Sequence, residues 1–216
     1  MIRLFCGFDR REGIGLHVFM SSVLAYATQP VSFVPLSSLG FAQGSNAFTL
    51  SRFQVAAMCG FKGHAIFCDG SDMLALDDIA RLDGLFDPNY AVQVVKHPTY
   101  VSVHERKYVG TEMEVPQSSY HRKNWASVML VNCEHHAWQR ASEYLANGDM
   151  LGILQFSFLS ESEIGDLPSQ WNVLVDERQY DVGAKLLHWT AGIPHFPHYA
   201  NAPRALDWFI AERRSR

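Results

Sequence analysis

The stretch FCDGSDML, residues 67–74, ends an apolar run that begins at His64. The pattern predicts a buried strand that delivers two carboxylates, Asp69 and Asp72, to the edge of a sheet. Side chains three positions apart lie on opposite faces of a strand, so the two acids converge only if Gly70 and Ser71 form a turn. Mg²⁺ and Mn²⁺ prefer such oxygen ligands, with substrate phosphates completing the coordination. An acidic turn without a cation is the competing interpretation.

Strands and helices alternate on both sides of this stretch. Apolar runs predict strands over residues 2–8, 31–36, 64–68, 90–95, 127–132 and 185–189. Helical spacing predicts helices over residues 13–27, 49–59, 76–85 and 134–146, and a last one capped by Asn201 with Pro203 in its first turn. This order is typical of an α/β fold with a mostly parallel central sheet flanked by helices and a site at the strands' carboxyl ends. No repeat or linker interrupts it, which predicts a single domain over residues 1–216.

Composition excludes several classes of protein. Of the 216 residues, 48% are apolar, enough for a sizeable core. Acidic residues outnumber basic ones 22 to 18, which argues against binding to nucleic acid. No apolar run approaches the roughly 18 residues of a membrane-spanning helix, and charges near the start argue against an export signal. The cysteines Cys6, Cys59, Cys68 and Cys133 show no metal spacing, so we expect reduced thiols and a cytoplasmic protein.

Two further segments carry candidate chemistry. His188 ends a late strand, and as a third ligand it would favour Mn²⁺ over Mg²⁺; a packed, hydrogen-bonded histidine is the alternative. The polar residues 123–127 lead into an apolar strand and form either a solvated loop or a substrate-binding edge. Residues 96–119 are irregular, polar and aromatic, and too long for a simple connection, which favours a lid or binding loop.

Together these segments resemble the family 8 glycosyltransferases, retaining enzymes with a single-domain GT-A fold, and especially their short bacterial glycosyltransferase-like members. The resemblance rests on six blocks in the expected order: Gly7–Asp9, Ser51–Phe53, Phe67–Leu74, Lys123–Asn132, Leu167–Asn172 and His188–Gly192. It implies a metal-dependent hexosyltransferase that moves a hexose from a UDP-sugar to a hydroxyl acceptor on a glycan or lipid-linked glycan. Acceptor specificity is then expected in residues 96–120.

The resemblance also implies where the nucleotide and the metal bind. It places Phe8 and Asp9 against the base, Arg52 near the ribose or the metal motif, and Ser71 among the nucleotide contacts. It assigns Mn²⁺, or Mg²⁺, to Asp69, Asp72 and His188. A Lewis acid at that position stabilises the charge that builds on the departing diphosphate.

On the sugar side, the resemblance implies that Asn124 and Ser127 face the transferred hexose. The acidic segment 159–163 lies where the family places its sugar-contacting motif. Glu161 and Glu163 are therefore expected to help stabilise a developing oxocarbenium ion. Solvated loop acids are the alternative.

Three departures from the family pattern affect these roles. Two residues rather than one separate Asp69 from Asp72, Ala126 or Ser127 stands where a glycine is usual, and the lysine of the final block is absent. One inserted residue after His188 brings His195 to the position of that lysine. Histidine clamps a diphosphate fully only when protonated, so UDP affinity would fall between about pH 6 and pH 8. Packing of His195 in an aromatic turn is the alternative.

Two other functions remain open on this sequence. The altered acidic motif and the missing lysine suit a non-catalytic relative that binds nucleotide sugars. A sugar nucleotidylyltransferase is disfavoured, because only Gly7 and Gly13 stand in the loop where such enzymes carry a glycine-rich phosphate motif. At the other end, residues 213–216 carry three arginines, which either contact an anionic membrane surface peripherally or complement a helix dipole.

Overall fold

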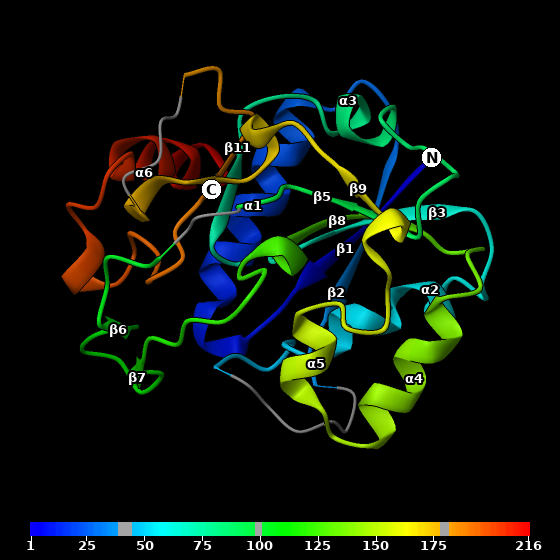
Figure 1. The fold of residues 1–216 in the computed structure, drawn as a ribbon. Helices are drawn as coiled ribbons and strands as arrows, with labels where there is room; N and C mark the ends of the chain where they lie inside the picture. Colours follow the sequence, from blue (N-terminus) through cyan, green and yellow to red (C-terminus); the bar gives the residue numbers. More distant parts are fainter. Residues whose placement is uncertain (39–44, 98–100, 178–181) are drawn as a thin grey trace.

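A six-stranded sheet in the order β2-β1-β3-β8-β5-β9 forms the centre of the computed structural model, which describes residues 1–38, 45–97, 101–177 and 182–216 (Figure 1). Its strands are β1 Ile2–Gly7, β2 Val31–Leu36, β3 His64–Cys68, β5 Val92–Val94, β8 Val128–Asn132 and β9 Ile164–Asp166. Only β8 runs against the other five within this sheet. The predicted α/β fold with a mostly parallel sheet is confirmed. Parts of two expected loops, residues 39–44 and 98–100, lie outside the described residues.

A smaller sheet positions the late histidine. It contains β10 Val173–Leu174, β11 Leu186–His188 and β4 Met73–Ala75. Strand β4, which the sequence analysis did not predict, runs antiparallel to β11 and pairs Met73 with His188. Because Asp72 directly precedes Met73, this register brings the histidine beside the acidic turn. A two-stranded hairpin, β6 Arg106–Lys107 and β7 Val115–Pro116, stands apart.

Helices cover the sheets at several places. They are α1 Gly13–Tyr26, α2 Val55–Met58, α3 Ile79–Asp83, α4 Trp138–Ala146, α5 Met150–Leu154 and α6 Ala205–Arg214. Helices α4 and α5 lie together on one side of the molecule, whereas α6 and the β6–β7 hairpin lie on the other (Figure 1). The helix expected over 49–59 is divided into a 3₁₀ turn, Ser51–Gln54, and α2. Helix α6 begins at Ala205 after Arg204 in the left-handed region, so the expected Asn201 cap is wrong.

The cysteines and the helix lengths were also predicted from the sequence. All four cysteines are free thiols, and burial raises the pKa of the Cys133 thiol to about 12. Among the described residues, no helix is both long enough and apolar enough to cross a bilayer.

Two glycines let the acidic turn fit between β1 and α1. A Cβ atom on Gly7 would lie 2.6 Å from the Asp69 carbonyl oxygen, and one on Gly15 would lie 1.9 Å from that of Ser71. Neither distance is tolerated between real atoms, so the close approach requires glycine at both positions. The Ser71 hydroxyl donates to the Gly7 carbonyl at 3.1 Å and fixes the turn against the end of β1.

Candidate active site

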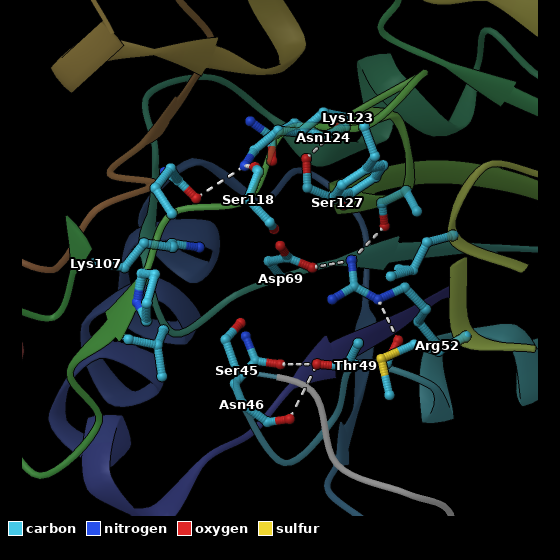
Figure 2. A pocket seen from close by; sticks show the side chains of 17 residues that line it. Ser45, Asn46, Thr49, Arg52, Asp69, Lys107, Ser118, Lys123, Asn124 and Ser127 are labelled. Carbon is cyan, nitrogen blue, oxygen red and sulfur yellow. Dashed lines mark hydrogen bonds and ion pairs between the residues drawn. The ribbon is translucent and has the colours of Figure 1, made fainter. Parts of the chain in front are cut away.

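A pocket of about 330 Å³ opens where β3 ends. Figure 2 shows Asp69 between Lys107 and Arg52, with Lys123, Asn124 and Ser127 on one wall and Ser45, Asn46 and Thr49 on the opposite wall. The remaining lining residues are Val115, Pro116, Gln117, Ser118, Tyr120, Ala126, Met150 and Leu154. The pocket therefore combines an acid, several cations and neutral polar groups at the sheet edge predicted from the sequence.

Asp69 lines this pocket, and Asp72 and His188 converge on it from behind the lining. One ligand atom from each lies within 4.8 Å of the other two, and all three side chains are buried. Gly70 supplies the turn with φ +73°, and the Ser71 amide donates to the Asp69 carbonyl at 2.8 Å. The extra residue between the acids is absorbed in this turn, so it does not separate the two carboxylates.

Two orphaned oxygens test whether a cation fits here. Asp69 Oδ1 and Asp72 Oδ1 are buried and accept no hydrogen bond from the described residues. Arg52 Nη1 lies 2.7 Å from Asp69 Oδ1, an ion-pair contact without hydrogen-bond geometry. Asp72 Oδ1 has no such contact in the described residues, and a buried acceptor left without a partner costs about 1–3 kcal/mol. Two carboxylates and one imidazole are a donor set that suits Mn²⁺, so the residues fit a divalent cation.

Asn172 orients the imidazole of His188. Its Oδ1 lies 2.9 Å from His188 Nδ1, and its Nδ2 donates to Ser127 Oγ at 2.8 Å. Nδ1 therefore carries the hydrogen, and Nε2, 3.3 Å from Asp72 Oδ2, faces the carboxylates. Partners of this kind fix the tautomer of metal-binding histidines. Asn172 ends one of the six blocks that carry the resemblance, but its spacing in the sequence predicted no role for it.

Burial and neighbouring charges set the protonation of these groups. Burial raises the pKa of Asp69 to about 6, against the opposing effect of Arg52. For Asp72, burial also raises the pKa, but His188, Lys107 and a backbone hydrogen bond together outweigh burial, and the pKa is lowered. Burial lowers the pKa of His188, but Asp72, Asp69 and Asp176 together outweigh burial, and the pKa is raised. Without a cation, Asp72 and His188 thus form an ion pair that a metal would displace.

Arg52 is fixed rather than free to follow a ligand. Its Nε donates to the Thr49 carbonyl at 3.0 Å and its Nη1 to the Ala126 carbonyl at 2.8 Å. The guanidinium carbon lies 5.3 and 5.2 Å from the ring centroids of Phe48 and Phe67. The structure thus places Arg52 at the metal motif, the second of the two positions that the resemblance implied.

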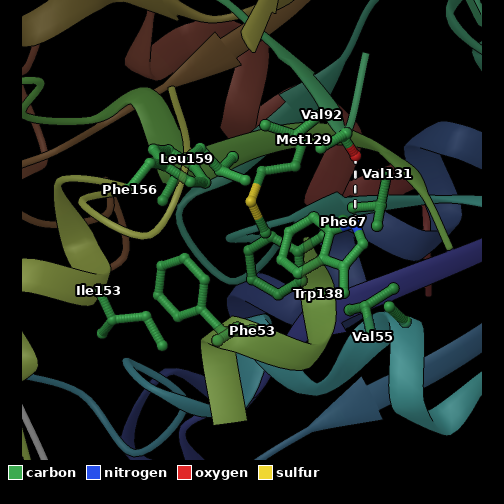
Figure 3. Close-up of a cluster of buried hydrophobic side chains, with 14 of the residues drawn as sticks. Phe53, Val55, Phe67, Val92, Met129, Val131, Trp138, Ile153, Phe156 and Leu159 are labelled. Carbon is green, nitrogen blue, oxygen red and sulfur yellow. Dashed lines mark hydrogen bonds between the residues drawn. The ribbon is translucent and has the colours of Figure 1, made fainter. Parts of the chain in front are cut away.

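An apolar cluster packs beneath Arg52 and Asp69. Figure 3 shows Phe67 and Met129 of the central sheet packed with Phe53 and with Trp138 of α4. The Trp138 indole donates to the Ala91 carbonyl at 3.1 Å, so even the polar atom of this ring is satisfied. Arg52 and Asp69 therefore stand on a densely packed support.

Phe8 and Asp9 border a second hollow of about 550 Å³, which also reaches Ala47. Ser45 and Asn46 line the pocket at Asp69, so the two hollows lie on either side of residues 45–47. The half-buried Phe8 ring borders this hollow and can stack on a base. Asp9 instead accepts from the Ala47 amide at 3.0 Å and from the Arg11 guanidinium at 2.8 and 2.6 Å. Its carboxylate thus holds Arg11 at the hollow.

Asn124 and Ser127 lie on the pocket wall. Asn124 adopts the left-handed region with φ +62°, which asparagine tolerates better than most residues. Its Nδ2 is buried and donates to no described residue. The Ser127 carbonyl accepts from the Asp69 amide at 2.9 Å, so the expected sugar-facing residues are coupled directly to the acidic turn.

The structure does not bring Ser71 or His195 to the pocket. Ser71 is fully buried, and its hydroxyl is committed to the β1 carbonyl described above. His195 is exposed, and its ring lies 6.0 Å from Trp208 of α6 and 6.4 Å from Phe196. The loop after β11 packs on α6, so the aromatic-turn alternative describes His195.

Glu161 and Glu163 also lie outside the residues that line the pocket. Glu161 forms an ion pair with Arg122. Glu163 accepts from the Ser160 amide at 2.8 Å, closing the 3₁₀ turn Glu161–Glu163, and pairs with Arg140 at 2.9 Å. Helix capping and surface ion pairs account for both acids, which corrects the expected contact with the sugar.

Residues 96–120, expected to form a binding loop, include the β6–β7 hairpin. The hairpin and residues 117–120 line the pocket. Glu177 accepts from Ser102 Oγ and the Val103 amide, and the Tyr108 amide donates to the Ala191 carbonyl. These contacts hold Lys107 toward Asp69. His104, Asp176 and Glu177 could also group around a cation, but their carboxylates accept hydrogen bonds within this anchor.

Glu12 is a further acid that the sequence analysis missed. Its side chain is fully buried just before α1, and neither carboxylate oxygen has a hydrogen-bond partner among the described residues. Burial, and then the charge of Asp72, raise the pKa of Glu12 well above its usual value.

We expect Glu12→Gln to stabilise the metal-free protein at alkaline pH. The pKa of Glu12 is raised on folding, so its favourable contribution is present below about pH 4.5 and is lost as pH rises through the folded-state pKa. Glutamine avoids that loss, worth about 1–3 kcal/mol. Thermal unfolding in EDTA at pH 8 and pH 5 measures the difference. A variant no more stable than the wild type at pH 8 would contradict an uncompensated acid.

Comparison with solved structures defines the class of fold. The chain superposes on the galactosyltransferase LgtC, crystallised with donor and acceptor sugar analogs, with a TM-score of 0.69 and 13% identity over 99% of this chain and 96% of that one. For the glycosyltransferase GlyE of Streptococcus pneumoniae TIGR4 the TM-score is 0.68 with 11% identity, covering 98% of this chain and 60% of GlyE. The fold is therefore that of the GT-A glycosyltransferases.

Sequence comparison then shows the family. Protein CDI of Arabidopsis thaliana is 30% identical over 95% of this chain and 84% of its own length, so the chain belongs to the family of Protein CDI. No protein-family model matches the chain.

Proposed function

We propose that residues 1–216 form one nucleotide-sugar-binding domain of the family 8 type, which transfers a hexose from a UDP-sugar to a hydroxyl acceptor with retention of configuration. The observation that carries this proposal is the convergence of Asp72 and His188 on Asp69, which lines a pocket in a GT-A fold, with one buried oxygen on each carboxylate that accepts no hydrogen bond from the described residues.

The pocket offers a place for each part of the donor. Phe8 would stack on the base in the hollow that continues past Ala47. Asp69, Asp72 and His188 would hold a divalent cation, which when bound stabilises charge on the leaving diphosphate. Lys107, from the β6–β7 hairpin, stands at the pocket beside Asp69 and would supply the cation that the family takes from its missing lysine.

Asn124 and Ser127 would orient the sugar. Asn124 lines the pocket, and its Nδ2 donates to no described residue, which leaves a donor for a sugar hydroxyl. Ser127 is fixed by Asn172, which also fixes His188. Sugar and metal contacts are therefore held by one hydrogen-bonded unit, which favours positioning as the source of rate enhancement.

A non-catalytic nucleotide-sugar-binding protein is the second candidate. Asp69 is the one carboxylate among the described residues that line the pocket, and the acids expected near the sugar lie elsewhere. Such a protein would bind the donor without turning it over.

Titration calorimetry with UDP, with Mn²⁺ and with EDTA, tests the proposal. We expect binding that requires the cation, followed by slow Mn²⁺-dependent hydrolysis of at least one UDP-sugar in a donor panel. NMR of the released sugar identifies the anomer and so tests retention. Cation-dependent binding without hydrolysis or transfer supports the second candidate, and absence of UDP binding refutes both.

A further inference from the structure

Resting on the proposed function, we propose that the site takes a substrate bearing a sugar carboxylate, a hexuronate, and that Lys123 binds that carboxylate. The hexuronate belongs to the donor or to the acceptor. Nothing in the resemblance assigns a role to this lysine, and three observations carry the inference.

Lys123 is a buried cation without a carboxylate partner in the described part of the chain. Its residue exposure is 6%, and its Nζ donates to Gln117 Oε1 at 2.8 Å and to the Ser118 carbonyl. Both acceptors are neutral, and an ammonium group has three hydrogens to donate. The residue lines the pocket, so a ligand can reach the third donor.

The charges around Lys123 leave its positive charge uncompensated. Burial, and then the charge of Lys107, lower the pKa of Lys123 to about 8, although Glu177 acts in the opposite direction. Glu177 already accepts from Ser102 Oγ, the Val103 amide and Thr190 Oγ1. A buried charge is tolerated when an opposite charge pairs with it, and here the pocket side is where an anion can enter.

The position of Lys123 assigns that anion to the sugar rather than to the diphosphate. Figure 2 shows Lys123 on the same wall as Asn124 and Ser127, the wall proposed to face the hexose. Asp69 and Lys107, which lies on the hairpin, line another part of the pocket, where the diphosphate is expected. A carboxylate attached to the hexose ring would thus reach Lys123 while the diphosphate stays at the cation.

Binding constants test this inference directly. Calorimetry with Mn²⁺ compares UDP, UDP-glucose, UDP-galactose, UDP-glucuronate and UDP-galacturonate, and then free glucuronate and galacturonate added to the complex with UDP. Lys123→Gln removes the charge but retains donors for Gln117 and Ser118, Lys123→Arg restores the charge, and Lys62→Gln removes an exposed lysine as the control.

For a donor uronate, we expect the wild type to bind one acidic UDP-sugar at least about tenfold more tightly than its neutral counterpart. Lys123→Gln should remove this preference and leave UDP affinity unchanged, whereas Lys123→Arg should retain it. For an acceptor uronate, the free acid binds the UDP complex and loses affinity in Lys123→Gln. The inference would be overturned if acidic and neutral sugars bound equally well both as UDP-sugars and as free sugars. It would also be overturned if Lys123→Gln lost as much affinity for UDP as for the acidic sugar. Failure of UDP to bind at all would instead refute the proposed function.

Discussion

Asp69→Asn and Asp72→Asn are each expected to reduce Mn²⁺-dependent UDP affinity more than about 100-fold, since loss of an outer partner of a metal ligand alone costs about 10–100-fold. Both acids converge with His188, and each has one oxygen that accepts no hydrogen bond from the described residues. Both are therefore expected to bind the cation. We therefore expect comparable losses from the two substitutions, measured by calorimetry and by Mn²⁺ binding in the absence of nucleotide.

Asp166→Asn provides a matched control. Asp166 also ends a strand of the central sheet, but its side chain is 72% exposed and pairs with Lys96. It should leave both affinities unchanged, and thermal unfolding should show that all three variants are folded. Retention of Mn²⁺ and UDP binding by Asp69→Asn would remove the metal-site interpretation. A loss confined to Asp69→Asn would show that Asp72 serves only to pair with His188.

Gly15→Ala is expected to have the largest effect on stability. The new Cβ would stand 1.9 Å from the Ser71 carbonyl oxygen, so either α1 or the acidic turn must move. Overpacking of this kind costs about 1–3 kcal/mol, which corresponds to about 2–12 °C in Tm for a domain of this size. Because the obstructed atom belongs to the turn that joins Asp69 to Asp72, Mn²⁺ affinity should fall together with the melting temperature.

Gly13→Ala separates this steric effect from helix propensity. Gly13 begins the same helix, but a Cβ there meets only the Phe8 ring at 3.8 Å, an ordinary contact. Alanine is the better helix former by up to about 1 kcal/mol, so this variant should be as stable as the wild type or more stable. Equal behaviour of the two variants would argue against the tight approach at Gly15.

The sequence determined the elements on which the site depends. The apolar run into Asp69, the strand into Asn132 and the strand ending at His188 were each readable from local periodicity, because a strand must bury its apolar residues wherever it lies. Parallel strands present their carboxyl ends at one edge, so Asp69 could be placed there without coordinates. The requirement for a turn at Gly70 was also local, and the structure confirms it.

Tertiary structure alone decided which distant groups meet at that edge. The pairing of β4 with β11 brings His188 to Asp72, and Asn172 links it to Ser127, contacts that depend on sheet register rather than on spacing along the chain. For the same reason spacing misplaced His195, which packs against Trp208.

The partners of the charged side chains were also decided by the tertiary structure. Glu161 and Glu163 lie near the expected motif in sequence, yet Arg122 and Arg140 pair with them away from the pocket. Lys107 is remote in sequence and faces the pocket because the hairpin is anchored on the loop after β11. Local pattern fixes which residues are buried in strands and helices, whereas the partner of a charged side chain depends on the path of the whole chain.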